Sequence, residues 1–259
     1  MRVLGIESSS LVASVALVTD DIMTAEYTVD FKKTHSQTLL PMLDEIVKLL
    51  ELDMDTIDAI AVAGGPGSFT GLRIGAATAK GLGLALKKPL VHVPTVDAMA
   101  YNMWGASGLV CPIMDAKRSQ VYTGLYHVEH GLEVLMGQCP MDMRELARLL
   151  NGRGERVIFL GDGVPVYRSI IEEKMQVSYG FAPAQMNRQR ASCVAVLGMT
   201  ALLDAGSSGR GTGAGGYRGA RLVGAADFAP DYLRKPQAER QREAELSANG
   251  AAAKLPGDY

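Results

Sequence analysis

A chain of 259 residues, 47% of them hydrophobic, is long enough to bury one large core or two smaller lobes. Its net charge of -2 excludes a general attraction to nucleic acid, so contact with RNA would need a local basic patch or a partner that supplies one. No apolar run approaches the roughly 18–20 residues that span a bilayer, and the acidic start argues against a signal peptide. We therefore expect a cytoplasmic protein. Its three cysteines have neither metal-ligand nor redox spacing, which favours reduced, buried thiols: Cys111, Cys139 and Cys193.

The first part of the chain predicts an α/β unit that opens with three strands. Short runs of β-branched and apolar residues mark the strands, and a helical spacing of apolar residues marks the main helix. The predicted strands are 3–6, 12–18, 23–29, 59–63 and 90–93. The predicted helices are 36–50, 71–86 and 95–101, the last opened by a cap at Thr95.

The opening pattern recurs in the second half of the chain. A strand, an acidic residue, a polar turn and a second strand occur around Glu7 and again around Asp115. The predicted elements of this half are strands 110–114, 121–128 and 157–160, helices 143–150 and 166–173, and an amphipathic helix 191–203. This duplication predicts a two-lobed α/β fold that uses a mixed-sheet ββαβα unit twice, as in the actin, Hsp70 and sugar kinase superfamily.

The repeat divides the chain into two lobes and a C-terminal part. We expect an N-terminal actin-like lobe at 1–105, which carries the partner interface, and a C-terminal actin-like lobe at 106–205. The stretch 206–226 is rich in glycine and poor in apolar residues, which favours a flexible loop over a phosphate contact. Its arginines are Arg210, Arg218 and Arg221. We expect 227–259 to be partly ordered and then to end in a disordered tail.

The glycine-punctuated segment 61–86 ends a buried strand, makes a turn and begins a small-residue helix. Because the first amides of a helix lack partners within it, such a join can present N–H groups to an anion. It is not a Walker loop, because no Gly-Lys-Ser/Thr follows the glycines. It is not a dinucleotide fingerprint either, because Gly81 and Gly83 fall inside the helix. The turn therefore either serves chemistry or brings a helix close to a partner.

Two carboxylates are the candidates for chemistry between the lobes. In a two-lobed phosphotransferase, acids at these positions help to place a metal–nucleotide complex. The first hairpin, however, lacks the Asp-x-Gly start that lets a backbone wrap closely around phosphate. We expect at most a vestigial nucleotide cleft, with Glu7, Ser8, Gly65, Gly67, Ser68 and Asp115 as its candidate residues.

The spacing of histidines and serines supports neither a metal site nor a nucleophile. His35 has Leu39 at the i+4 position where a second helical ligand would stand. His127 and His130 fall at a strand end and a turn, which is typical of exposed histidines. The serines near Ser8 have no histidine at readable spacing. We therefore expect no catalytic residue, no metal and no cofactor bound by this chain itself.

The helix over 35–50 carries more apolar residues than a single stripe of about 100° requires. The helix after Gly71, rich in glycine and alanine, could pack closely beside it. Two such helices could meet counterparts from another subunit in a four-helix interface, and the alternative is burial within the chain. The candidate interface residues are His35, Leu39, Leu40, Leu43, Ile46, Val47, Leu50, Ile74, Ala77 and Leu82.

Five segments, in this order, resemble the TsaB (YeaZ) family of bacteria: IESSSLVASVAL, HSQTLLPML, GGPGSFTGLRIG, MDAKRSQVYTGLY and PDYLRKPQAE. The resemblance covers nearly the whole chain, through about Glu239. It implies an actin-like fold and a role in making N6-threonylcarbamoyladenosine beside the tRNA anticodon. In that family the subunit is understood as the non-catalytic partner of TsaD, which transfers the threonylcarbamoyl group.

The resemblance also implies the partners and their cofactors. The chain would form a heterodimer with TsaD and a ternary complex with the ATPase TsaE, and these partner subunits would use ATP and a metal ion. Without TsaD, the same face could pair two copies in a homodimer. The tRNA would be reached indirectly through the complex, without a membrane.

Two other classes remain as alternatives. The first is an actin-fold nucleotide-binding phosphotransferase or ATPase that uses Glu7 and Asp115. The second, an M22-type metallopeptidase, is disfavoured because the chain shows no protease machinery. TsaD-like proteins carry a paired-histidine metal motif on the helix that matches 35–50, and here Leu39 stands where the second ligand would fall.

Overall fold

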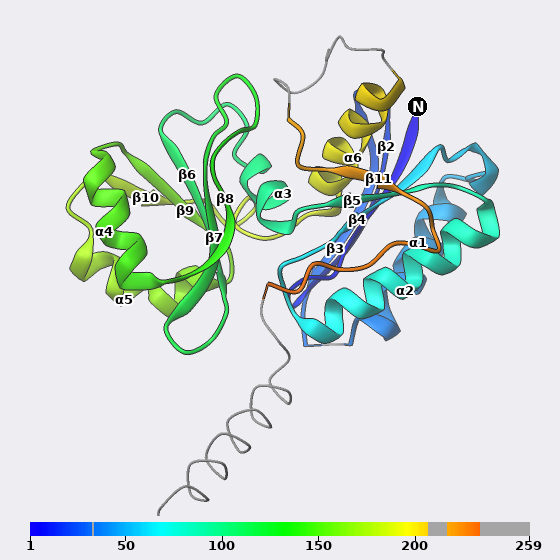
Figure 1. The fold of residues 1–259 in the computed structure, drawn as a ribbon. Coiled ribbons are helices and arrows are strands. Elements are labelled where there is room, and N and C mark those ends of the chain that lie inside the picture. Colours follow the sequence, from blue (N-terminus) through cyan, green and yellow to red (C-terminus); the bar gives the residue numbers. More distant parts are fainter. Residues whose placement is uncertain (33, 207–216, 234–259) are drawn as a thin grey trace, which may run out of the picture.

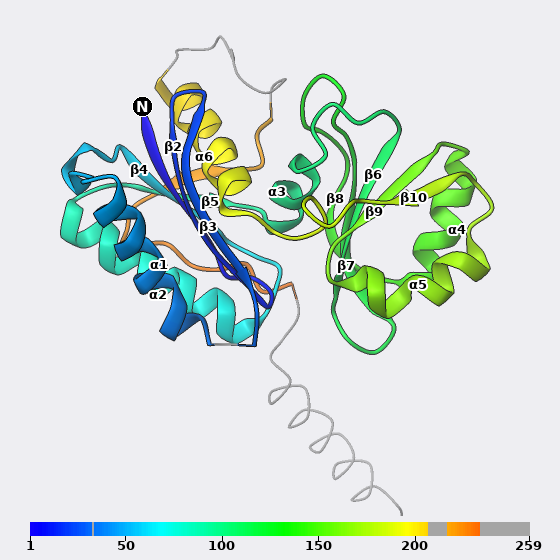
Figure 2. The same cartoon turned by 180° about the vertical axis from the view of Figure 1, so that it is seen from behind.

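The computed structural model describes residues 1–32, 34–206 and 217–233. Two lobes stand side by side, each built around a mixed β-sheet (Figure 1). Seen from behind, the same two lobes are joined through the short helix α3 and the chain that enters α6 (Figure 2). The predicted two-lobed α/β architecture is confirmed.

The two sheets repeat one arrangement. In the first, β1 pairs antiparallel with β2 and parallel with β4; in the second, β6 pairs in the same two ways with β7 and β9. The first sheet has the order β11-β5-β4-β1-β2-β3 and consists of Arg2–Glu7 (β1), Val12–Thr19 (β2), Ile22–Asp30 (β3), Ala59–Ala63 (β4), Leu90–Val93 (β5) and Arg221–Val223 (β11). The second has the order β10-β9-β6-β7-β8 and consists of Leu109–Asp115 (β6), Gln120–His127 (β7), Glu133–Asp142 (β8), Val157–Leu160 (β9) and Tyr179–Phe181 (β10).

The helices form layers on the sheets. The helices are His35–Leu49 (α1), Phe69–Leu86 (α2), Thr95–Tyr101 (α3), Met143–Arg153 (α4), Gly163–Lys174 (α5) and Ala191–Gly206 (α6), with a 3-10 turn at Met54–Thr56 (η1). Helices α1 and α2 cover one face of the first sheet and α6 covers the other (Figures 1 and 2). Helices α4 and α5 lie against the second sheet.

The alternation of side chains along β4 explains why both faces of the first sheet are covered. Ala59 and Ala61 belong to the apolar cluster that contains α6, whereas Ile60 and Val62 pack with α1 and α2. The small side chains of Ala59 and Ala61 let α6 approach this face of the sheet closely. A Cβ added at Gly198 of α6 would collide with the side chain of Ala61.

Helix α6 corrects two predictions. It packs on β1, β2 and β4, so the predicted lobe 106–205 wrongly assigned it to the second lobe. Most of its described side chains are buried, including Val194, Ala195 and Leu197, so it is apolar around most of its circumference and not amphipathic. The helix lies between the first sheet and α3, which leaves it little exposed surface.

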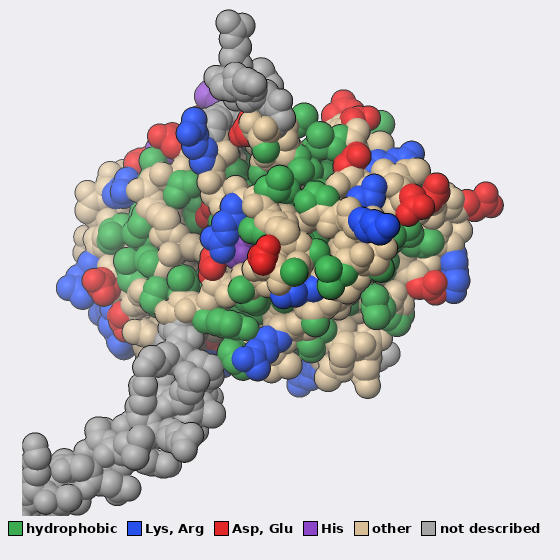
Figure 3. All heavy atoms as spheres, turned by 45° about the vertical axis from the view of Figure 1, so that its right-hand side comes forward, with side chains coloured by type: hydrophobic (Ala, Val, Ile, Leu, Met, Phe, Trp, Pro, Cys, Tyr) green, Lys and Arg blue, Asp and Glu red, His purple; other side chains and the backbone are tan. Residues whose placement is uncertain are grey.

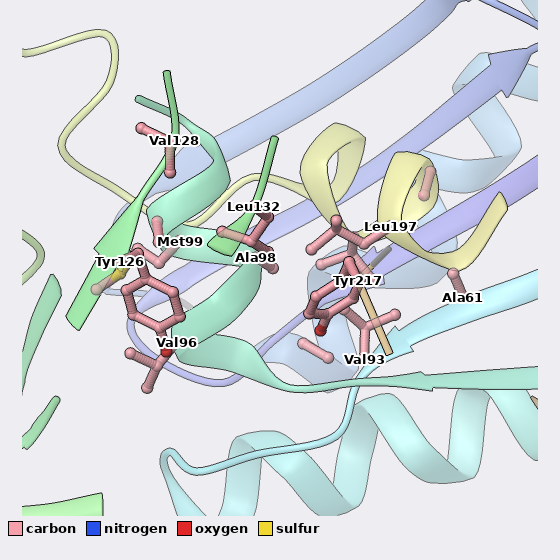
Figure 4. Packing of buried hydrophobic residues seen from close by; sticks show 14 of the residues in the cluster. Ala61, Val93, Val96, Ala98, Met99, Tyr126, Val128, Leu132, Leu197 and Tyr217 are labelled. Atoms are coloured by element: carbon pink, nitrogen blue, oxygen red, sulfur yellow. The ribbon is translucent and has the colours of Figure 1, made fainter. Parts of the chain in front are cut away.

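An apolar cluster continues from one lobe into the other. Figure 4 shows Tyr126 and Leu132 of the second lobe near Met99 of α3, with Leu197 of α6 and Val93 of the first sheet further along. At its centre the buried Asp97 accepts hydrogen bonds from the hydroxyls of Tyr126 and Tyr217, each 2.7 Å long. Burial raises the pKa of Asp97, while these two bonds lower it. The lobes are therefore joined by packed side chains as well as by the chain itself.

The C-terminal part is more ordered than its composition suggests. The expectation of a flexible loop over 206–226 is wrong for residues 217–226: Tyr217 is buried, and β11 pairs antiparallel with β5. The predicted loop also includes 207–216, which lie outside the described residues, as do 234–259. Phe228 is buried against the first lobe, which agrees with partial order after 227. A few apolar side chains hold this segment in place, and its high glycine content made them hard to recognise in the sequence.

Two smaller differences concern local elements. Strand β8 was not predicted, because Gly137 and Pro140 interrupt its apolar pattern. Thr95 does not cap α3: the cap position is Pro94, and the Thr95 hydroxyl accepts a hydrogen bond from the Gly65 amide instead.

Candidate functional site

Three of the predicted interface residues are part of the protein's own core. Leu39, Leu43 and Ile46 are at most 5% exposed and pack between α1 and the first sheet. His35 is also buried, and its Nε2 lies 3.0 Å from the carbonyl oxygen of Val12. These four residues therefore cannot form a partner surface, because the surplus apolar width of α1 is directed largely inward.

The outer faces of α1 and α2 nevertheless expose apolar residues. Leu40 is 53% exposed, and Leu50 and Ala77 are exposed as well. Val47, Ile74 and Leu82 are partly buried. Figure 3 brings this lobe forward and shows hydrophobic side chains recurring between charged ones across it.

Two exposed leucines on these helices were not among the predicted interface residues. Leu49 is 80% exposed on α1 and Leu84 is 60% exposed on α2. Leu84 continues a stripe through Ala77 and Gly81, at spacings of four and three residues, and a Cβ at Gly81 would meet nothing within 4 Å. This spacing was readable in the sequence. We call Leu40, Ala77, Gly81 and Leu84 the α1–α2 surface; Leu49 lies nine residues from Leu40, on the opposite flank of α1, and is not part of it.

The first hairpin turn, between β1 and β2, is sealed by the chain itself. Glu7 Oε1 accepts a 2.6 Å hydrogen bond from the amide of Ser9, and the carbonyl of Ser9 accepts one from the amide of Ser68. The Ser8 hydroxyl donates to the carbonyl of Gly71, where an added Cβ would collide with the Ser8 backbone. Ser8 and Ser9 are almost fully buried. The turn and the start of α2 therefore pack backbone against backbone.

This packing occupies the glycine-rich turn. The Ser68 hydroxyl caps α2 by accepting from the Gly71 amide, and a Cβ at Gly67 would collide with Ser9. Gly65 has a φ of 112°, and the carbonyl of Asp231 fills the space beside it. The glycines bring the helix close to its neighbours, which is the second of the two roles that the sequence left open.

The second hairpin turn, between β6 and β7, repeats the carboxylate contact but is exposed. Asp115 Oδ1 accepts a 2.8 Å hydrogen bond from the amide of Lys117, two residues on, as Glu7 does in the first turn. Asp115 Oδ2 lies 2.6 Å from the Lys117 ammonium. Tyr167 donates its hydroxyl to Asp115 and fixes the base of the turn. Lys117, Arg118 and Ser119 are all exposed.

The backbone of this second turn is strained. Lys117, Arg118 and Ser119 have φ values of 65°, 57° and 60°, a conformation that costs a non-glycine residue about 1–2 kcal/mol. Gln120 donates its amide to the Lys117 carbonyl, so Arg118 and Ser119 are the two central residues of the turn. Hairpins of this geometry prefer Asn-Gly at those positions.

Acidic groups from both lobes interact electrostatically near the two turns. Burial raises the pKa of Glu7 to about 7, and Asp162 contributes to the rise. Burial likewise raises the pKa of Asp162 to about 6, and Arg188 opposes the rise. Burial would also raise the pKa of Asp115, but hydrogen bonds from Lys117 and Tyr167 outweigh it and lower that pKa. Asp162 was missed in the sequence although it follows β9 much as Glu7 ends β1.

Within residues 1–32, 34–206 and 217–233, no three histidine, cysteine, aspartate or glutamate side chains are grouped so that they could hold a metal ion. No helix in this described part is long and apolar enough to cross a bilayer.

Comparisons with known proteins agree with this architecture. The family model "TsaD: tRNA N6-adenosine threonylcarbamoyltransferase" matches residues 29–241. A tRNA threonylcarbamoyladenosine biosynthesis protein TsaB from Bacillus subtilis is 34% identical over 200 residues, which cover 76% of this chain and 87% of that protein. YeaZ from Pseudomonas aeruginosa aligns with a TM-score of 0.70 at 23% identity, covering 90% of this chain and 99% of its own.

A more distant structure shares the fold. The activator of the 2-hydroxyisocaproyl-CoA dehydratase from Clostridium difficile, with bound ADPNP, aligns with a TM-score of 0.50 at 9% identity over 83% of this chain and all of its own. Two hairpin-led lobes with their carboxylates at matching positions define an actin-like fold. Within that class, the chain belongs to the TsaB (YeaZ) family.

Proposed function

We propose that this chain is the non-catalytic partner subunit of a TsaD-type transferase in tRNA threonylcarbamoyladenosine biosynthesis. The name of its Bacillus subtilis relative supports the pathway. The single observation that carries the partner role is the α1–α2 surface, which exposes leucines in a chain whose first hairpin turn is filled by its own residues.

The α1–α2 surface has the properties of a helix-packing interface. It lies on two neighbouring helices of 15 and 18 residues, and leucines flank the small residues Ala77 and Gly81. Small side chains let a second pair of helices approach closely, and the leucines then supply buried apolar area. In this arrangement the transferase contributes two helices, and a second copy of this chain takes their place when the transferase is absent.

The experiment that tests this role is co-purification with the transferase. Leu40→Glu combined with Leu84→Glu places two charges on the α1–α2 surface, so we expect the complex to be lost and the chain to remain folded. Val166→Glu is the matched control, because Val166 is 54% exposed on α5 of the other lobe. If the double variant still co-purifies as the wild type does, the proposed surface is wrong.

Leu43 and Ile46 are unsuitable for this test. Both are buried in the core of the first lobe, so charged substitutions there would unfold the chain instead of only breaking a contact. The loss of the complex would then say nothing about the surface.

The remaining roles follow from the same proposal. The transferase and TsaE supply the ATP and metal chemistry, TsaE joins a ternary complex, and the assembly works in the cytoplasm. This chain needs no cofactor, because the turn before α2 is packed against the first hairpin, where the Ser68 amide donates to the Ser9 carbonyl.

A second candidate function is an actin-fold nucleotide enzyme, and one observation favours it. Asp162 contributes to the raised pKa of Glu7, and Glu7 Oε2 and Asp162 Oδ1 have no hydrogen-bond partner within the described residues. Calorimetry with ATP and magnesium decides between the two functions. Micromolar binding that is lost in Glu7→Ala would favour the enzyme, whereas the scaffold role predicts no binding.

A further inference from the structure

We propose that the exposed turn between β6 and β7 binds a phosphate group of the RNA that the complex modifies. The choice of RNA rests on the proposed function, while the phosphate chemistry rests on the turn itself. The turn comprises Lys117, Arg118 and Ser119 and lies at the lower end of the second lobe in Figure 1.

The sequence of the turn is not the one that its backbone prefers. Arg118 and Ser119 occupy the two central positions at φ values of 57° and 60°, where asparagine and glycine would fit without strain. Lys117 precedes them in the same left-handed region, so three non-glycine residues in a row adopt it. Such outliers concentrate at functional sites, where the side chain matters more than the strain. In this turn the strained positions carry the cationic side chains of Lys117 and Arg118 and the hydroxyl of Ser119.

The turn also presents unused hydrogen-bond donors. Among the described residues, the amides of Arg118 and Ser119 have no acceptor and the guanidinium of Arg118 has no carboxylate partner. The charge of Asp115 is paired with the Lys117 ammonium at 2.6 Å, and the Tyr167 hydroxyl donates a hydrogen bond of 3.0 Å to the same carboxylate. Adjacent amides in a turn together with one free guanidinium form a common anion site. A phosphate oxygen is the anion that matches this set of donors.

The exposure of the turn favours an RNA backbone over a free nucleotide. In an actin-like protein a nucleotide would lie between the two hairpin turns, and here the first turn is packed against Ser68 and Gly71. A phosphodiester needs only exposed donors on one side, since contacts to the backbone position RNA without enclosing a base.

The test compares three variants of the full chain in tRNA binding, measured by fluorescence anisotropy across a series of KCl concentrations. It is run with the chain alone and with its transferase partner. We expect Arg118→Gln to weaken binding roughly tenfold, and the slope of log affinity against log salt to fall by about 0.7–0.9, the value for one phosphate contact. Arg148→Gln, an exposed arginine on α4 of the same lobe, should change neither quantity.

The third variant separates binding from folding. The pair Arg118→Asn and Ser119→Gly gives the turn its preferred sequence, so the fold should become more stable while tRNA binding weakens as in Arg118→Gln. A turn with a purely structural role would lose no affinity in this variant.

Three results would overturn the proposal. Arg118→Gln could leave tRNA affinity and the salt slope unchanged, or Arg148→Gln could lower both equally, which would indicate only a general charge effect. Alternatively, Arg118→Gln could abolish ATP binding in calorimetry without changing tRNA affinity, and the turn would then be a nucleotide site. Failure of the partner role is a separate observation, because it appears as loss of co-purification in the wild type.

Discussion

The two hairpin turns of this protein share one contact and differ in almost everything else. In each, a carboxylate at a strand end accepts a hydrogen bond from the amide two residues on: Glu7 from Ser9, and Asp115 from Lys117. The first turn is buried and packed against α2, whereas the second is exposed, strained and cationic. The same hairpin turn is therefore part of the packed interior in the first lobe and is accessible to solvent in the second.

The difference lies in the neighbours that each turn meets. Gly67 before α2 and Gly71 in its first turn leave room for the backbone of Ser9 and Ser8. At the second turn, the Ser119 carbonyl accepts the Met143 amide and Tyr167 braces Asp115 from below, so the tip stays uncovered. A duplicated backbone therefore does not imply a duplicated site.

The largest expected effect is a loss of stability when the packing between the β1–β2 turn and α2 is disrupted. Gly71→Ala adds a Cβ that collides with the Ser8 carbonyl, so we expect a loss of about 3 kcal/mol in the free energy of unfolding. The measurement is urea denaturation of the variant and the wild type.

Gly81→Ala is the matched control in the same helix. Its Cβ meets nothing within 4 Å, so the higher helix propensity of alanine should raise stability by about 1 kcal/mol. Equal losses in both variants would show that the first turn is not closely packed on α2.

A second effect is a pH dependence of opposite sign in the two turns. The folded-state pKa of Glu7 is about 7, above its value of 4.5 in the unfolded chain, so the native state holds the proton more tightly. Stability should therefore fall as pH rises from 4.5 through 7, by about 3 kcal/mol in total. Urea denaturation at several pH values should show this decline in the wild type. Glu7→Gln should remove the part that extends to pH 7 and leave the part due to Asp162, whose pKa is raised to about 6.

Asp115 should give stability the opposite dependence on pH. Its folded-state pKa is lowered, so its contribution is present above the unfolded value of 3.8 and is lost as pH falls below that value through the folded pKa. Asp115→Asn should remove this acid-side loss and leave the decline near neutral pH intact. If the free energy of unfolding depends on pH in the same way in the wild type and both variants, burial of Glu7 and pairing of Asp115 do not set the pH dependence of stability.

The smallest effect concerns the strained tip. Replacing Arg118 and Ser119 by asparagine and glycine should raise the free energy of unfolding by about 1 kcal/mol, because it relieves two left-handed residues. Thermal unfolding monitored by calorimetry measures the change. A lower melting temperature would mean that side-chain contacts of Arg118 or Ser119 outweigh the relief of strain.

The fold was readable from the sequence where local pattern and environment agree. The recurrence around Glu7 and Asp115 predicted two lobes, and the apolar run at β4 predicted a buried strand. Strands β8 and β11 were missed, because glycine and proline weaken their local signal and tertiary pairing restores it. No periodicity in α6 could tell which lobe it would cover.

The candidate site was readable only in part. The pattern of α1 shows many apolar positions but not which of them meet the sheet, so buried Leu39 and Leu43 looked like interface residues. Exposed Leu84 continues a readable stripe with Ala77 and Gly81. The strain at Arg118 was not readable, because it depends on the backbone that the paired strands impose.

The most direct test of the central claim is a reconstituted threonylcarbamoyl-transfer reaction on tRNA. We predict that this chain alone produces no modified adenosine and that it supports the reaction when added to the transferase. The variant with Leu40→Glu and Leu84→Glu should lose that support, while Val166→Glu keeps it. Transfer by the isolated chain, or full support from the double variant, would contradict the account.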